Sequence, residues 1–108
     1  MGITTHVLDT SRGRPAAGVP VRLERGGAML GSGRTDADGR LRDLLPPHIP
    51  LHAGVYRLVF ETGVYFREAG VEAFYPHVSI DFEVRDPAQH HHVPLLLSPF
   101  GYSTYRGS

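Results

Sequence analysis

Apolar residues recur at every second position in several short stretches of this chain, and glycine or proline closes each stretch. Val19, Val21 and Leu23 alternate with polar neighbours, and residues 78–84 repeat the pattern. Successive side chains of a strand point to opposite faces, so this spacing gives each stretch one apolar face. Thirteen glycines and nine prolines in 108 residues are too many for a helical bundle of this size. The pattern therefore predicts short strands that pack their apolar faces together.

The expected elements follow from where the alternation begins and ends. We predict strands at residues 4–8, 19–24, 28–34, 54–61 and 78–84, and two more within the C-terminal segment 92–108. Turns are predicted at residues 11–15 and 36–39, where Gly39 suits a positive φ angle. The only helical candidate is the stretch 64–69, which Gly70 follows. A chain of this length suits a single domain, here an all-β antiparallel sandwich over residues 1–108.

Composition excludes several classes of partner and chemistry. Acidic and basic residues balance to a net charge of zero without any basic stripe, so neither nucleic acid nor a membrane is an expected partner. Cysteine is absent, which excludes disulfides and thiolate chemistry, and the absence of lysine excludes a Schiff base. No apolar run approaches the roughly 20 residues that span a bilayer, and no secretory leader is recognisable. The expectation is a soluble cytoplasmic protein.

The C-terminal segment is the most distinctive part of the chain. A chain terminus is normally frayed and tolerant of substitution, yet this one carries tyrosines, hydroxyl residues and an arginine. It reads His92-Val-Pro-Leu-Leu-Leu-Ser-Pro-Phe-Gly-Tyr-Ser-Thr-Tyr-Arg-Gly-Ser108. This run resembles the C-terminus of the hydroxyisourate hydrolases, the transthyretin-related enzymes of urate breakdown. Two further segments resemble the same family, so the likeness extends from Ile3 to Ser108: Ile3-Thr-Thr-His-Val-Leu-Asp-Thr-Ser-Arg-Gly-Arg-Pro-Ala16 and Arg34-Thr-Asp-Ala-Asp-Gly-Arg-Leu41.

The resemblance implies a transthyretin-like β-sandwich of two sheets with one short helix. It also implies hydrolysis of 5-hydroxyisourate, whose cyclic amide opens to 2-oxo-4-hydroxy-4-carboxy-5-ureidoimidazoline in urate (purine) degradation, without a cofactor. In this family the arginine that matches Arg40 enters the active site, and the tail that matches Tyr105, Arg106 and Ser108 lies against the substrate. The family assembles as a homotetramer, a dimer of dimers, with sites at the subunit interface.

Strand parity selects among the seven histidines. Val7 and Val93 are expected to point into the sandwich, which turns His6 and His92 outward and His91 inward. In the related fold the terminal strands are neighbours in one sheet. The two outward histidines should therefore converge on one outer face.

Ser103 and Tyr105 are expected on the same outer face as the two histidines. We assign His6 and His92 to water activation and proton transfer, because neutral imidazole suits both tasks. Arg40 would bind and polarise the substrate through its planar fork of donors, and Tyr105 would position it. The division of roles between the two histidines stays open.

Three consecutive histidines also raise the question of metal binding. Adjacent residues of a strand point to opposite faces, so only His90 and His92 could share an ion. We therefore expect incidental capture of ions and no native metal site.

Two non-enzymatic functions compete with hydrolysis. A transthyretin-type carrier would bind a small aromatic ligand in the same groove without chemistry, but it would not need proton-transfer groups there. A sandwich used only for adhesion or assembly would not need the C-terminal motif. An outward Leu96 further indicates that a second subunit covers this face.

Overall fold

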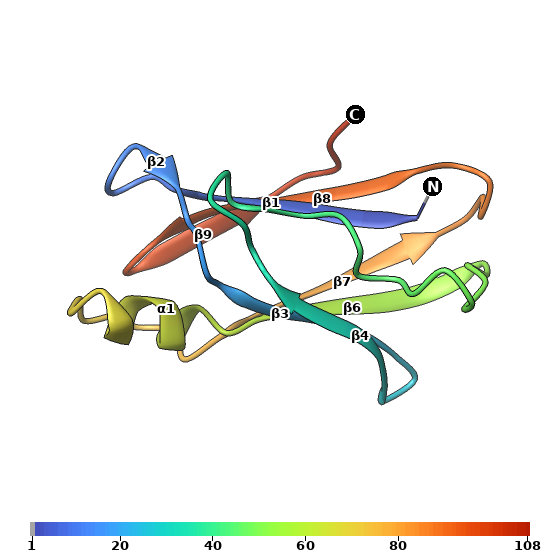
Figure 1. The fold of residues 1–108 in the computed structure, drawn as a ribbon, viewed down its shortest axis with the longest axis horizontal. Coiled ribbons are helices and arrows are strands. Elements are labelled where there is room, and N and C mark those ends of the chain that lie inside the picture. The colour runs from blue at the N-terminus through green and yellow to red at the C-terminus, as the bar shows by residue number, and fades with distance from the viewer. Residues whose placement is uncertain (1) are drawn as a thin grey trace.

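The computed structural model describes residues 2–108 and shows two sheets packed face to face, with a short helix at one end (Figure 1). The first sheet contains β1 (Ile3–Asp9), β2 (Arg14–Pro15), β5 (Arg40–Leu41), β8 (His91–Ser98) and β9 (Gly101–Thr104). The second contains β3 (Pro20–Arg25), β4 (Ala28–Arg34), β6 (Gly54–Phe60) and β7 (Val78–Val84). The helix α1 spans Thr62–Glu68. The predicted all-β sandwich with one short helix is confirmed.

The strand order places the two ends of the chain side by side. The first sheet runs β2-β1-β8-β9, with β5 also paired to β1, and the second runs β4-β3-β6-β7. All strand pairs of the described residues are antiparallel except β1 and β8, which run parallel from Ile3 opposite His91 to Asp9 opposite Leu97. This one parallel pair departs from the antiparallel pairing expected. Parallel strands need a long crossover, and here the whole second sheet provides it.

The core lies between the two sheets, and the predicted parity is found on both terminal strands. Val7 and Leu95 are fully buried, while His6, His92 and Leu96 are only partly covered on the outer face. The inner faces of both sheets supply the largest buried side chains: Ile3, Leu23, Tyr56, Leu58, Phe60, Leu95 and Leu97. Burial of these apolar surfaces is the main stabilising contribution to the fold.

A buried carboxylate joins β1 to α1. Asp9 accepts hydrogen bonds from the hydroxyls of Tyr65 (2.8 Å) and Ser11 (2.6 Å) and from the backbone N–H groups of Ser11 and Arg12. Burial acts to raise the pKa of Asp9, but the bonds from Ser11, Tyr65 and the backbone outweigh it and lower that pKa. Burial and the bond to Asp9 raise the pKa of Tyr65 to about 12.

The helix begins two residues before the predicted start. Gly63 is a poor helix former in isolation. In the structure its N–H donates to the Pro76 carbonyl at 3.1 Å, and a Cβ at this position would lie 2.5 Å from that oxygen. Tertiary packing therefore places a glycine inside the first turn. Within residues 2–108, no helix has the length and apolar character needed to cross a membrane.

Candidate active site

His6 and Arg40 are cross-strand partners on the outer face of the first sheet. His6 on β1 lies directly opposite Arg40 on β5 in an antiparallel ladder. Directly opposed residues project to the same face, so the guanidinium and the imidazole emerge side by side. The structure thus gives Arg40 a defined strand position although the sequence suggests a loop.

The turn before β5 holds Arg40 in place. Asp36 Oδ1 accepts hydrogen bonds from the N–H groups of Asp38 (2.9 Å) and Arg40 (3.0 Å). Gly39 adopts a φ of +75° and its carbonyl accepts the Val7 N–H at 2.7 Å. A Cβ at Gly39 would lie 2.3 Å from the Val7 carbonyl oxygen, so only glycine lets the turn approach β1 this closely.

The tautomer of His6 follows from its partner. His6 Nε2 lies 2.9 Å from the backbone carbonyl of Asp38. A carbonyl oxygen only accepts hydrogen bonds, so Nε2 carries the proton and donates it. Nδ1 is then the nitrogen of the neutral His6 ring that can take up a proton.

His92 is held from two sides. Thr4 stands beside it on the neighbouring parallel strand, and Thr4 Oγ1 lies 2.7 Å from His92 Nδ1. On the other side the Gly107 N–H donates to the His92 carbonyl at 2.9 Å. A Cβ at residue 107 would lie 2.5 Å from His92 Cδ2, so the C-terminal segment packs on the ring only because Gly107 has no side chain.

The electrostatic environment favours the neutral form of His92. Burial lowers the pKa of His92 below its usual value of 6.5, and the positive charges of Arg40, His90 and His6 lower it further. A neutral imidazole at physiological pH can accept a proton from water.

A pocket of about 240 Å³ opens over this part of the sheet, and it is lined by Thr4, Arg40, Arg42, His90, His92 and Ser108. Three predicted site residues, Arg40, His92 and Ser108, therefore meet in one pocket, with His6 paired to Arg40 on the same face. Sequence reasoning missed Thr4 and Arg42 and considered His90 only as a metal ligand. Each has a detectable signal, because each stands two positions from an outward site residue.

Ser103, Tyr105 and Arg106 lie outside this pocket. Ser103 is exposed opposite Leu96 on the outer face. The strand β9 ends at Thr104, so its parity does not extend to Tyr105. Tyr105 and Arg106 instead line a separate pocket beside β7, and Arg106 donates to Gln89 Oε1 at 3.1 Å. The expected placement of Tyr105 next to His92 is therefore not found within the single chain.

The three consecutive histidines alternate as predicted. His91 is buried, its Nδ1 has no partner among residues 2–108, and burial and Arg106 lower its pKa. The rings of His90 and His92 are stacked, with centroids 6.4 Å apart. In the part of the chain that the structure describes, no three His, Asp or Glu side chains are arranged to hold a metal ion.

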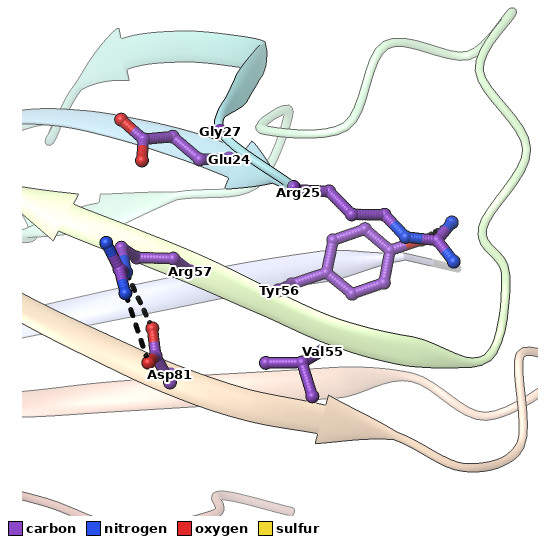
Figure 2. Close-up of a pocket in the computed structure, with 8 residues that line it drawn as sticks. Glu24, Arg25, Gly27, Val55, Tyr56, Arg57 and Asp81 are labelled. Carbon is purple, nitrogen blue, oxygen red and sulfur yellow. Dashed lines mark hydrogen bonds and ion pairs between the residues drawn. The ribbon is translucent and has the colours of Figure 1, made fainter.

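A second pocket lies on the other sheet (Figure 2). Its charged side chains are already engaged. Arg57 donates to Asp81 at 2.7 Å, Glu24 pairs with Arg22, and the Arg25 guanidinium lies 5.1 Å from the centre of the Tyr56 ring. No histidine lines this pocket. It offers no proton-transfer group for neutral pH, so the outer face of the first sheet is the better candidate for chemistry.

This chain is similar to known proteins over nearly its whole length. The sequence profile of the HIUase/Transthyretin family matches residues 3–107. The 5-hydroxyisourate hydrolase of Caulobacter vibrioides is 50% identical, and the match covers 99% of this chain and 98% of that protein. The 5-hydroxyisourate hydrolase of Mus musculus is 46% identical, with 98% and 94% covered.

Solved structures give the same result. The 5-hydroxyisourate hydrolase of Klebsiella pneumoniae matches with a TM-score of 0.89 and 44% identity, covering 98% of this chain and 92% of that one. The transthyretin of Sparus aurata matches with a TM-score of 0.87 and 31% identity, covering 97% and 95%. Sequence and transthyretin-like fold together show that this chain belongs to the HIUase/Transthyretin family.

Proposed function

We propose that this chain is a hydrolase that opens the cyclic amide of 5-hydroxyisourate to 2-oxo-4-hydroxy-4-carboxy-5-ureidoimidazoline in urate degradation. One observation carries the proposal: His6, Arg40 and His92 project together from one outer face. A carrier of aromatic ligands has no need of two imidazoles beside a guanidinium. The relatives named 5-hydroxyisourate hydrolase are 44–50% identical to this chain, whereas the matched transthyretins are 30–31% identical.

In the proposed mechanism His92 activates water. Its lowered pKa keeps the ring neutral, so Nε2 takes a proton as the water oxygen bonds to the ring carbonyl carbon of the substrate. The carbonyl oxygen becomes an oxyanion, and the Arg40 guanidinium donates hydrogen bonds to it. The carbon–nitrogen bond of the cyclic amide then breaks, and the departing nitrogen takes the proton back.

We assign the second histidine to proton transfer at Nδ1. His6 Nε2 is engaged by the Asp38 carbonyl, which leaves Nδ1 to exchange protons with the substrate. Ser103, Tyr105, Arg106 and Ser108 are proposed to bind the substrate. Of these only Ser108 lines the pocket with Arg40 and His92 in one chain.

We further propose that the active unit is a homotetramer, a dimer of dimers with sites shared between subunits. The outer face is open in the single chain and presents the partly exposed Leu96 beside the site residues. Ligand sites are concave and exclude most water, which a lone sheet face does not achieve. A second copy across a two-fold axis would enclose the pocket and bury Leu96.

The test is a direct assay. 5-Hydroxyisourate is generated in situ from urate with urate oxidase, and its ultraviolet decay is followed with and without this protein. Acceleration that scales with protein concentration supports hydrolysis. An unchanged decay rate accompanied by saturable binding would reject hydrolysis and support the carrier function.

A further inference from the structure

Thr4 contacts two histidines with one hydroxyl group. Thr4 Oγ1 lies 2.7 Å from His92 Nδ1 and 2.8 Å from His90 Nε2. A hydroxyl has one proton, so it can donate to only one ring nitrogen and must accept from the other. With both rings neutral, the three groups form a directional chain with only two possible orientations.

The first orientation leaves His92 able to act as a base. His92 Nδ1–H donates to Thr4 Oγ1, Thr4 donates to His90 Nε2, and His92 Nε2 keeps its lone pair. In the reverse orientation Thr4 donates to His92 Nδ1, and the proton of the His92 ring occupies Nε2. Only the first orientation is compatible with water activation at His92 Nε2.

We propose that Thr4 and His90 are positioning residues that hold His92 in its Nδ1–H tautomer, through the chain from His92 Nδ1 to Thr4 Oγ1 to His90 Nε2. This inference rests on the proposed function, in which His92 is the base. Thr4 and His90 do not touch the reacting atoms in this role. They act by setting which nitrogen of His92 faces the substrate without a proton.

The packing around His92 fixes which edge of the ring faces Thr4. Gly107 lies against Cδ2, on the side of the ring opposite Nδ1. A half-turn of the ring would place a carbon at Thr4 and a nitrogen against the backbone, which loses the hydrogen bond. The Thr4 contact therefore fixes the rotation of the ring, and the direction of the chain through Thr4 to His90 decides the tautomer.

The charged groups that face His92 cannot replace this contact. Arg40 from β5, His6 from β1 and His90 from the preceding loop all lower the pKa of His92, and Arg42 lines the same pocket. Arg40 and Arg42 only donate hydrogen bonds, and the neutral rings of His6 and His90 offer no anionic acceptor for Nδ1–H. Thr4 Oγ1 is the acceptor present on that side of the ring.

Two substitutions at Thr4 separate the effect of the hydroxyl group from the effect of the side-chain shape. Thr4→Val keeps the β-branched volume and removes the hydroxyl, whereas Thr4→Ser keeps the hydroxyl. We expect Thr4→Val to lower kcat about tenfold, the rate equivalent of one neutral hydrogen bond, with KM little changed. Thr4→Ser should stay within about twofold of wild type.

The pH profile gives a readout that a structural role would not move. An Nδ1–H bond to Thr4 is stronger in the imidazolium than in the neutral ring, so it favours protonated His92. Its loss in Thr4→Val should shift the acid limb of kcat/KM to lower pH. A shift to higher pH would mean that Thr4 donates to Nδ1, and it would overturn the proposal.

His90→Phe removes the terminal acceptor of the chain and should give a smaller loss of kcat than Thr4→Val. The matched control is His77→Phe, another exposed histidine that does not line the pocket, which should behave as wild type. Equal activity of wild type, Thr4→Val and His90→Phe would overturn the proposal.

Nitrogen-15 NMR of the His92 ring tests the tautomer without any turnover. We expect the Nδ1–H form in wild type and Thr4→Ser, and a mixed population in Thr4→Val. An inactive wild type with the Nδ1–H form would reject the proposed function while keeping the tautomer assignment. An active wild type with the Nε2–H form would reject the positioning role alone.

Discussion

Three separate parts of the chain meet at His92. Thr4 on β1 contacts its Nδ1, Arg40 on β5 lowers its pKa, and Gly107 packs on its Cδ2. Thr4 and Gly107 lie against different edges of the ring, and Arg40 acts through its charge. A single substitution at this point should therefore change chemistry more than stability.

Replacing His6, Arg40 or His92 with alanine should abolish most activity in a folded protein. These side chains project from the outer face, so truncation leaves no cavity in the core. Loss of a positioned proton-transfer group typically lowers the rate about 10²- to 10⁴-fold. The measurements are kcat/KM and thermal unfolding of each variant.

The matched control for this series is His91→Phe. His91 is buried on the opposite face, and phenylalanine keeps an aromatic ring there while removing the unpartnered Nδ1. It should retain activity. Equal losses in His91→Phe and His92→Ala would show that the assignment of faces is wrong.

Gly107→Ala should also reduce activity sharply. The added Cβ would meet His92 Cδ2 at 2.5 Å, so either the tail or the ring must move. Because the tail is a short surface segment, the free energy of unfolding should change by less than about 1 kcal/mol. The control is Gly70→Ala, whose Cβ meets nothing within 4 Å, although its positive φ makes that substitution mildly strained. A fully active Gly107→Ala enzyme would show that the C-terminal segment does not position His92.

At the scale of elements, the link between β1 and α1 depends on one buried hydrogen bond. Tyr65 donates to Asp9 at 2.8 Å across 56 residues of sequence. When the Tyr65 hydroxyl is removed, Asp9 still accepts hydrogen bonds from Ser11 and Arg12, so its carboxylate remains hydrogen-bonded. Loss of this hydrogen bond should lower the free energy of unfolding and leave the topology of the fold unchanged.

Tyr65→Phe should therefore cost about 1 to 3 kcal/mol in the free energy of unfolding. The wild type has a further signature at high pH. The pKa of Tyr65 is raised to about 12 in the folded state, so its stabilising contribution is complete below pH 10 and is lost as pH rises from 10 to 12. The free energy of unfolding, measured by chemical denaturation across this pH range, should fall more steeply for wild type than for Tyr65→Phe. Parallel curves would mean that Tyr65 ionises equally easily in both states.

Most elements were predictable because their signals are local. The alternation in β3, β6 and β7 and the parity around His6 and His92 needed only neighbouring residues. The two-residue strand β5 was not predicted, because its pairing with β1 depends on the close approach at Gly39. The parallel register of β1 and β8 is a long-range property that no local pattern encodes.

The positions of the candidate site residues were predictable where these residues lie on regular strands. His6 and His92 follow strand parity, and Ser108 reaches the pocket as the resemblance implied. Tyr105 does not, because it lies just beyond the end of β9, where alternation no longer applies. Thr4 was missed because a threonine in a strand is ordinary, and only its distances to two rings reveal a role.

At the scale of the whole molecule, the sheet face that carries the proposed site is open in a single copy. The proposed tetramer would bury Leu96 and enclose the pocket. Leu96→Glu should then weaken assembly and lower activity while each subunit stays folded, because a carboxylate is costly in an interface. Analytical ultracentrifugation at the assay concentration gives the direct measurement.

The control for Leu96→Glu is Val55→Glu, an exposed apolar position on the other sheet. It should leave both assembly and activity unchanged. A fully active monomer, in wild type or in Leu96→Glu, would contradict the shared site.

The parallel pairing of β1 with β8 has a consequence for folding. Thr4 and His92 are 88 positions apart, so the pocket exists only after one of the longest loops in the chain has closed. A fold rich in such distant contacts is expected to form slowly. During translation the edge of β1 that pairs with β8 stays unpaired until β8 leaves the ribosome. The pocket should therefore form only after β8 has been synthesised, and the unpaired edge of β1 is the part most in need of protection from aggregation before then.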